Sequence, residues 1–182
     1  MQSVVAIPML AVATPLVGVS PIPSPAVVLS QDAPTVQASA ITTPEEVDRK
    51  ERAQKIDALL AKYNSPLEGY GMKFVEEADK NDIDWRLLVA IAGQESTFGI
   101  HACKKAANSF LGYGSCKISF KSVDEAIEKV SASLGGNLES TARHYGGDKT
   151  TLQILKKYNQ VIPGYQSQVM RLMKKIDPSE IV

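Results

Sequence analysis

Apolar side chains recur at the three- and four-residue spacing of an α-helix along this chain, from residue 43 to about residue 178. Only residues 117–120 alternate apolar and polar side chains as a strand would. The pattern therefore predicts a mainly α domain over residues 43–182. Its apolar faces are Ile56, Leu59, Leu60 and Tyr63; Met72, Val75 and Ala78; Leu87, Leu88 and Ile91; Val123, Ile127, Val130 and Leu134; Leu152, Leu155 and Tyr158; and Tyr165, Val169, Leu172, Met173 and Ile176.

Helix start and stop signals divide this pattern. A hydroxyl residue followed three positions later by glutamate is a capping box, which satisfies the free N–H groups at a helix start. Asp84 can cap the helix that follows it. Gly99 and residues 135–136 predict helix ends, because glycine accepts the left-handed backbone found there. The three boxes are Thr43 with Glu46, Ser65 with Glu68, and Ser122 with Glu125.

Residues 100–121 interrupt the helices. They contain Gly112 and Gly114, and the alternation at residues 117–120 indicates a small hairpin. We expect a loop region here. It lies between two predicted helices of the domain.

The same loop holds both cysteines of the chain, Cys103 and Cys116. An even cysteine count in an exported protein favours a disulfide, which would contribute on the order of 3 kcal/mol for so short a loop. Two free thiols are the first alternative. The second is a metal site that adds His101 and His144, although this spacing matches no usual zinc pattern.

Residues 1–42 have a different composition. Residues 4–19 are mostly apolar, and Ala38 and Ala40 have the small-residue spacing of a signal-peptidase site. However, the first basic residue is Arg49, and prolines interrupt the apolar run. We expect an export segment followed by a linker rich in Pro, Ala and Ser, either disordered or cleaved. Any membrane contact would be made here. The alternative is a tail without a targeting role.

The net charge of the chain limits which classes of partner are good candidates. The chain has 20 basic and 20 acidic residues, so its formal net charge is zero. Nucleic-acid-binding domains usually show a basic surplus, and nucleic acid is therefore a poor candidate partner. No pattern in the sequence calls for a nucleotide, haem, metal or other cofactor.

Glu95 is the residue with the clearest candidate chemistry. It continues the apolar stripe of Leu87, Leu88 and Ile91 near the end of a predicted helix. Burial and the negative end of the helix dipole both favour a protonated carboxyl group. A neutral carboxylic acid is what a general acid for glycosidic bond cleavage needs.

The residues around Glu95 resemble the catalytic-helix motif of lysozyme-like peptidoglycan hydrolases, in which the glutamate is followed by serine and then by glycine. Here those positions are Ser96 and Gly99. Residues 108–114 and 120–127 are similar to segments that follow the glutamate in the bacterial endo-β-N-acetylglucosaminidase branch. Residues 158–165 resemble the tail of that branch and of the lytic transglycosylases. The resemblance covers about residues 65–176.

This resemblance implies a lysozyme-like helical fold and an exported monomer that acts on peptidoglycan glycan strands. Glu95 would be the catalytic acid, and Tyr158 would point into the cleft and assist it. The substrate-binding candidates are Ser96, Asn108, Tyr113 and Asn159.

A second catalytic carboxylate is not evident. Glu125 is better explained as the capping partner of Ser122. Glu139 and Asp148 fall in a predicted polar loop and are expected at the surface. Three hypotheses follow: a glucosaminidase, a lytic transglycosylase that forms an anhydro-sugar with the same acid, and a catalytically silent wall-binding module.

Overall fold

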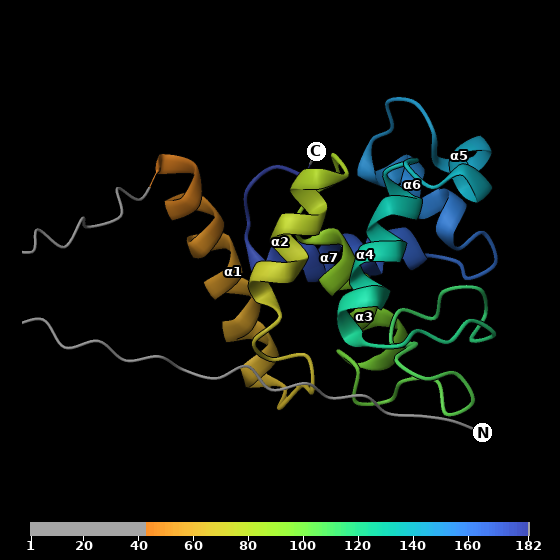
Figure 1. Cartoon of the computed structure of the whole chain (residues 1–182), viewed down its shortest axis with the longest axis horizontal. Coiled ribbons are helices and arrows are strands. Elements are labelled where there is room, and N and C mark those ends of the chain that lie inside the picture. The colour runs from red at the N-terminus through yellow and green to blue at the C-terminus, as the bar shows by residue number, and fades with distance from the viewer. Residues whose placement is uncertain (1–42, 182) are drawn as a thin grey trace, which may run out of the picture. The chain divides into compact units, whose positions relative to one another are not determined.

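Seven helices and the loops between them make up residues 43–181, the part of the chain that the computed structural model describes (Figure 1). No strand occurs in this part, so the predicted mainly α class is confirmed. The predicted export segment and linker, residues 1–42, lie outside the described residues. The helices are α1 (Pro44–Lys62), α2 (Gly71–Lys80), α3 (Leu87–Ser96), α4 (Val123–Leu134), α5 (Glu139–Tyr145), α6 (Thr151–Tyr158) and α7 (Tyr165–Ile176).

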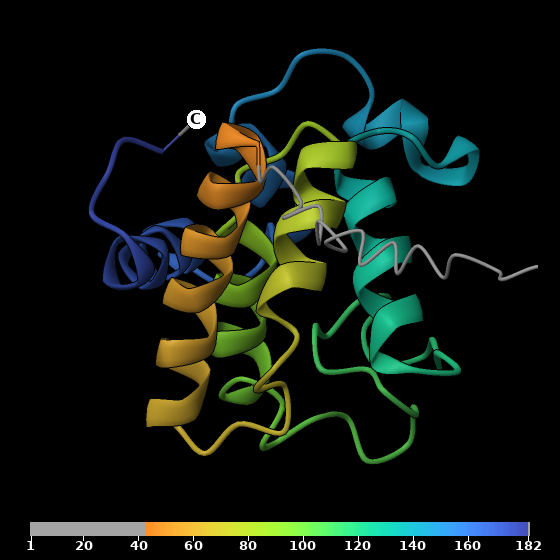
Figure 2. The ribbon, with the colours of Figure 1, turned by 60° about the vertical axis from the view of Figure 1, so that its left-hand side comes forward.

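Helix α3 is the central helix of the core. Its residues 87–92 are all at most 3% exposed, so the helix is buried on every side rather than along the single predicted stripe. Helix α7 packs along α3, and α2 packs against both α1 and α4. Figure 2 shows α2 between α1 and α4, with α3 behind this row. The end of α3 therefore holds its side chains inside the domain.

One of the three predicted capping boxes forms in full, at α1, and a second supplies the cap of α4 while its Glu125 carboxylate accepts from the Lys121 N–H instead of the Ser122 N–H. At α1, Thr43 Oγ1 accepts from the Glu46 N–H at 3.2 Å, and Glu46 Oε2 accepts from the Thr43 N–H at 3.0 Å. At α4, Ser122 Oγ accepts from the Glu125 N–H at 3.1 Å. The sequence alone can predict these helix starts, because each cap uses only residues within one helical turn.

The predicted box at Ser65 is wrong. Helix α2 begins at Gly71, and Ser65 Oγ instead donates to the Phe98 carbonyl at 2.6 Å while accepting from the Leu67 N–H at 3.0 Å. A buried hydroxyl needs hydrogen-bond partners, and the Ser65 hydroxyl bonds a carbonyl distant in the chain instead of an N–H group at a helix start. Ser65 thus joins the α1–α2 connection to the segment after α3.

The predicted cap Asp84 belongs to a buried ion pair. Its Oδ2 accepts from Arg86 Nη2 at 2.6 Å, and its Oδ1 accepts from the Arg86 N–H at 3.0 Å directly before α3, which begins at Leu87. Arg86 is 1% exposed and also donates to the carbonyl oxygens of Asp177 and Glu180. The pair fastens the C-terminal segment to the start of α3.

The end of α3 also differs from the prediction. The C-cap is Thr97, whose φ of 51° is left-handed, and Gly99 follows two residues later with a φ of 87°. The chain then runs through residues 97–122 without the predicted hairpin. A lone backbone hydrogen bond of 2.9 Å, from Phe120 N–H to the Ala107 carbonyl, joins the two sides of this loop where a ladder was expected.

Helix α5 was predicted as part of a polar loop. Its seven residues bury only Tyr145, so they carry no apolar repeat that could reveal a helix. The helix ends at Tyr145 with Gly146 as its C-cap, and α6 follows with Thr150 capping its start. No helix in the described part of the chain is both long and apolar enough to cross a membrane.

Candidate active site

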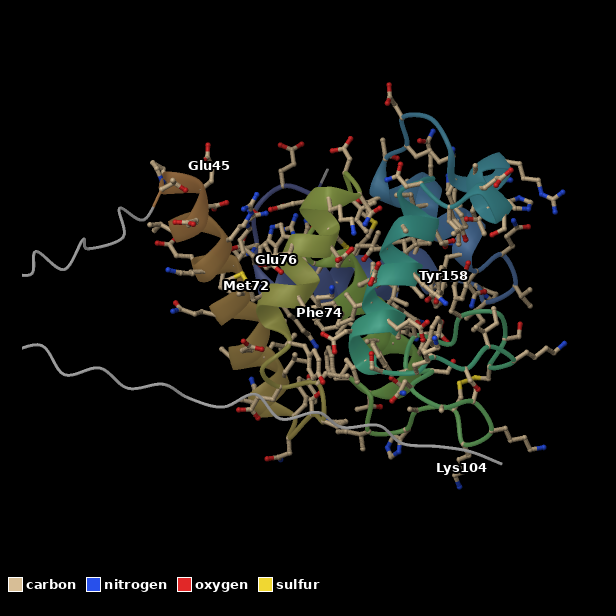
Figure 3. The ribbon with its side chains drawn as sticks, viewed as in Figure 1. Glu45, Met72, Phe74, Glu76, Lys104 and Tyr158 are labelled. Carbon is tan, nitrogen blue, oxygen red and sulfur yellow. A yellow bond between two sulfur atoms is a disulfide. The ribbon has the colours of Figure 1, made fainter. Side chains whose placement is uncertain are left out.

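A pocket of about 480 Å³ opens where the end of α3 meets the α3–α4 loop and the ends of α5 and α6. Five consecutive loop residues, 112–116, form one side. Figure 3 labels Tyr158 in the interior beside this loop, and Lys104 points away from the loop's outer edge. The remaining lining residues are Glu95, Tyr145, Tyr158 and Asn159.

Glu95 supplies the acidic group of this pocket. Its side chain is partly buried, and Oε1 accepts a hydrogen bond of 2.7 Å from the hydroxyl of Tyr165. Gly112 lies against the other oxygen, because a Cβ at this position would overlap Oε2 and come within 2.9 Å of Cδ. One oxygen is thus held by α7, and the other lies close to the backbone of Gly112.

Tyr165, which holds Glu95 in this pocket, was not among the site residues predicted from the sequence. It is fully buried at the first position of α7, where its ring counted only as part of the apolar face. Burial raises the pKa of its phenol, and the hydrogen bond to Glu95 raises it further. Tyr165 therefore stays protonated and acts as a donor. The one sequence signal was its hydroxyl, since a buried tyrosine needs a hydrogen-bond partner.

Tyr158 lines the pocket but does not bind Glu95. Its hydroxyl donates to the Leu111 carbonyl at 2.5 Å, and its ring stacks on Tyr165 with centroids 6.3 Å apart. Burial raises its pKa well above the usual value, and the charge of Glu95 adds to the shift. This contact holds the loop next to Gly112, and the assistance of Tyr158 to the acid stays a prediction.

Tyr113 and Asn159 also line the pocket, as two of the predicted substrate-binding residues. The Tyr113 hydroxyl hydrogen-bonds Ser133 Oγ at 2.8 Å, which leaves part of its ring toward the pocket. Asn159 Oδ1 accepts from the N–H groups of Val161 and Ile162 and so shapes the turn after α6. Both residues have fixed orientations before any ligand binds.

Ser96 and Asn108, the other two candidates, lie outside the pocket lining. Ser96 is buried, donates to the Phe110 carbonyl at 2.6 Å and accepts from the Gly99 N–H at 2.8 Å. Asn108 donates to the Phe120 carbonyl at 2.8 Å. Their polar groups tie the loop to α3 and across itself, so in this arrangement they hold the loop instead of reaching the predicted substrate.

Cys103 and Cys116 form a disulfide, the first of the three alternatives considered from the sequence. Cys116 itself lines the pocket, so the bond fixes the loop that forms its side. A disulfide sulfur is not a thiolate ligand, which removes the metal site with His101 and His144. No cluster of metal-binding side chains occurs within residues 43–181.

Among the lining residues, Glu95 is the one carboxylate. Glu125 instead pairs with Lys129 at 2.8 Å and accepts from the Lys121 N–H. The hydrogen bond from Lys129 lowers the pKa of Glu125, and the one from Lys121 lowers it further. Glu139 and Asp148 also lie outside the lining. The pocket therefore offers one acid and no opposing carboxylate.

Comparisons with known proteins give no family for this chain. No protein-family model, curated protein or solved structure matches it. The described residues establish a mainly helical fold and a pocket that combines one carboxyl group with the rings of Tyr113, Tyr145 and Tyr158. A function is therefore inferred from the chemistry of this pocket.

Proposed function

We propose that this chain is a glycosidase that cleaves the β-1,4-linked amino-sugar backbone of peptidoglycan, of the endo-β-N-acetylglucosaminidase type. Glu95 is its general acid, and its helical domain is of the lysozyme-like kind that the sequence resembles. The observation that carries the proposal is the partly buried Glu95 carboxyl, held at one oxygen by Tyr165 and opening at the other into a tyrosine-lined pocket.

The position of the transferable proton supports an acid role. The Tyr165 hydroxyl donates to Oε1, so that oxygen is an acceptor. In the protonated acid, the proton then resides on Oε2, which carries no competing hydrogen bond from Tyr165. The absence of a side chain at Gly112 lets Oε2 lie close to the loop backbone, and Glu95 lines the pocket in which the oxygen of a glycosidic bond would sit. A general acid must come within hydrogen-bond distance of that oxygen.

The rest of the pocket suits a sugar. Its volume of about 480 Å³ is in the range of small-ligand sites. The tyrosine rings offer apolar faces for the C–H faces of a pyranose, while hydroxyl and amide groups at the rim can accept and donate hydrogen bonds. Because these rings are fixed by contacts with Ser133 and Leu111, little ordering accompanies binding.

With one carboxylate present, the attacking group comes from the substrate. The N-acetyl oxygen of the glucosamine attacks the anomeric carbon, the glycosidic C–O bond breaks, and Glu95 gives its proton to the leaving oxygen. The resulting cyclic oxazolinium ion is opened by water. The Glu95 carboxylate takes one proton from that water, which restores the acid. The products are two glycan fragments and the net consumption of one water.

The same single carboxylate favours a second candidate, a lytic transglycosylase. Here the 6-hydroxyl of the muramyl sugar attacks its own anomeric carbon, and Glu95 both protonates the leaving oxygen and receives the hydroxyl proton. The product is an anhydro-sugar, and no water is consumed. Product mass separates the two reactions, because only hydrolysis adds a water.

The substrate sets the location, since peptidoglycan lies outside the cytoplasmic membrane. An exported enzyme meets it there. The disulfide between Cys103 and Cys116 fits such an oxidising compartment. We propose an exported monomer that works without a cofactor.

Clearing of purified peptidoglycan tests the proposal. The variant Glu95→Gln keeps the size of the side chain and removes the transferable proton, so clearing should stop. Glu51→Gln, at an exposed position of α1, makes the same chemical change elsewhere and should leave clearing unaffected. Equal clearing by Glu95→Gln would overturn the acid role. A wild-type protein that binds the polymer but never clears it would instead identify a silent wall-binding module.

A further inference from the structure

Two further pockets lie in the same part of the domain as the Glu95 pocket, and one of them shares a lining residue with it. The first, of about 550 Å³, runs along the ends of α2 and α4 and the α5–α6 loop, and Tyr145 lines both it and the Glu95 pocket. The second, of about 500 Å³, shares Asp148, Lys149 and Gln153 with the first. Tyr145 is thus the side chain that the Glu95 pocket has in common with this pair of pockets.

The second pocket is cationic. Its six lining residues include Lys149, Lys156 and Lys157 and a single acid, Asp148. Within residues 43–181, Lys156 and Lys157 form no ion pair, and Lys149 donates only to the Gly146 carbonyl. Helices α6 and α7 contain basic residues but no acidic ones. Cationic side chains without an acidic partner are available for an anionic ligand.

We propose that this cationic pocket, defined by Lys149, Lys156 and Lys157, binds the carboxylates of the acidic peptide branches that the glycan substrate carries. The inference rests on the proposed function, since peptidoglycan sugars bear short peptides with free carboxylates. The first pocket, with Asn137, Thr150 and Gln153 in its lining, takes the uncharged part of the branch. The chain thus recognises the peptide as well as the sugar.

A branch of four residues extends at most about 13–14 Å when straight. We expect it to leave the sugar near Tyr145, which lines both the Glu95 pocket and the first pocket, and to run toward the lysines of the second. Naked glycan has no anionic group to meet these lysines, and so it gains nothing from them. Lysine is suited to the task as a compact point charge that binds carboxylates in varied geometries.

One double variant, measured on two substrates, tests the inference. The double variant Lys156→Gln/Lys157→Gln should lower kcat/KM on intact peptidoglycan about 3- to 10-fold, as the loss of two exposed charge pairs predicts. It should leave cleavage of the same polymer, stripped of peptides by an amidase, unchanged. High salt should abolish the difference between wild type and variant on the intact polymer.

A matched control keeps this result specific. Lys174→Gln/Lys175→Gln removes the same charge from an exposed part of α7 that lines none of the three pockets. It should behave as the wild type on both polymers. An equal loss in both double variants, or a loss on stripped glycan as large as on the intact polymer, would overturn the inference.

Direct binding separates this inference from the proposed activity. A synthetic stem tetrapeptide, L-Ala-γ-D-Glu-L-Lys-D-Ala, should shift the NMR signals of Lys156 and Lys157 saturably, whether or not any glycan is cleaved. The same peptide with amidated carboxylates should shift them less. No saturable shift with the tetrapeptide would overturn the inference, as would tighter binding of a poly(glycerol phosphate) than of intact peptide-bearing glycan.

Discussion

The hydroxyl of Tyr165 donates a hydrogen bond of 2.7 Å to Oε1 of Glu95 and so joins the first residue of α7 to the end of α3, 70 positions apart in the chain. Both helices pack along each other in the core. The orientation of the acid is therefore fixed by the core itself. In this role Tyr165 is a positioning residue, since it acts through Glu95.

Tyr165→Phe should impair catalysis while preserving the fold. The change removes only the oxygen that binds Glu95. Because a hydrogen bond to a carboxylate contributes about 1.5–3 kcal/mol, kcat/KM should fall about 10- to 100-fold. Steady-state kinetics should assign the loss to kcat rather than KM. Tyr63→Phe, whose ring packs on Phe98 at 4.6 Å, is the control and should retain full activity. An active Tyr165→Phe enzyme would refute the positioning role.

Gly112→Ala should disturb the acid directly. The added Cβ would overlap Oε2 of Glu95, and alanine also strains the backbone at a φ of 68°. Gly69→Ala separates these effects, because Gly69 has a φ of 88° and no other atom lies within 4 Å of the place that its added methyl group would take. Activity assays should show a large loss for Gly112→Ala and little change for Gly69→Ala. Equal losses in both would assign the effect to backbone strain.

Reduction of the disulfide should impair the function of the pocket while the helices stay folded. Dithiothreitol can act at one place only, since the chain has two cysteines and both are bonded. Release of the loop should lower the free energy of unfolding by about 3 kcal/mol. It should also reduce clearing of peptidoglycan while circular dichroism keeps its helical signal. Full activity of the reduced protein would show that the loop holds its position without the bond.

Arg86→Met should strongly destabilise the domain. The change leaves the buried Asp84 carboxylate without its guanidinium and frees the C-terminal segment, and breaking a buried ion pair in this way costs about 3–5 kcal/mol. Chemical denaturation would measure the change. Arg49→Met breaks an ion pair with Asp79 in which the arginine side chain is 43% exposed, and it should have a much smaller effect. Similar losses of stability from both changes would contradict the proposed role of the Arg86–Asp84 pair in holding the C-terminal segment.

Alkaline pH should destabilise the fold through the site tyrosines. Burial raises the pKa of Tyr145 to about 12 and raises those of Tyr158 and Tyr165 as well. These groups ionise more easily in the unfolded chain, where the pKa is about 10. Their contribution is therefore complete below pH 10 and is lost as the pH rises above it. Unfolding measured from pH 8 to 11.5 should show this decline, and Tyr165→Phe should make it less steep.

The sequence was informative wherever a feature depends on neighbours along the chain. The capping residues Thr43 and Ser122 start helices as predicted, because a cap needs only the next three residues. Helix α5 escaped prediction because Tyr145 is its one buried residue. Ser65 had the right spacing for a cap but found a stronger tertiary partner in the Phe98 carbonyl.

The site was predictable only in part, because it depends on contacts between residues that are far apart in the chain. Periodicity placed Glu95 and Tyr165 on apolar faces, yet it does not specify which faces meet. Tyr158 lines the pocket, and its hydroxyl binds the Leu111 carbonyl, a loop group with no sequence signature. Ser96 and Asn108 look like ligand-binding residues in the sequence, and in the fold their polar groups bind backbone carbonyls.

The most direct test of the central claim, that Glu95 cleaves glycosidic bonds in peptidoglycan, is mass spectrometry of the soluble fragments from a digest of the purified polymer. The wild-type protein should release fragments with a new reducing N-acetylglucosamine end, each heavier by one water than the corresponding anhydro form, and Glu95→Gln should release none. Anhydro-sugar ends would show that the reaction is that of a lytic transglycosylase, with the same acid, and not hydrolysis. Identical fragments from wild type and Glu95→Gln, or no fragments from either, would contradict the claim.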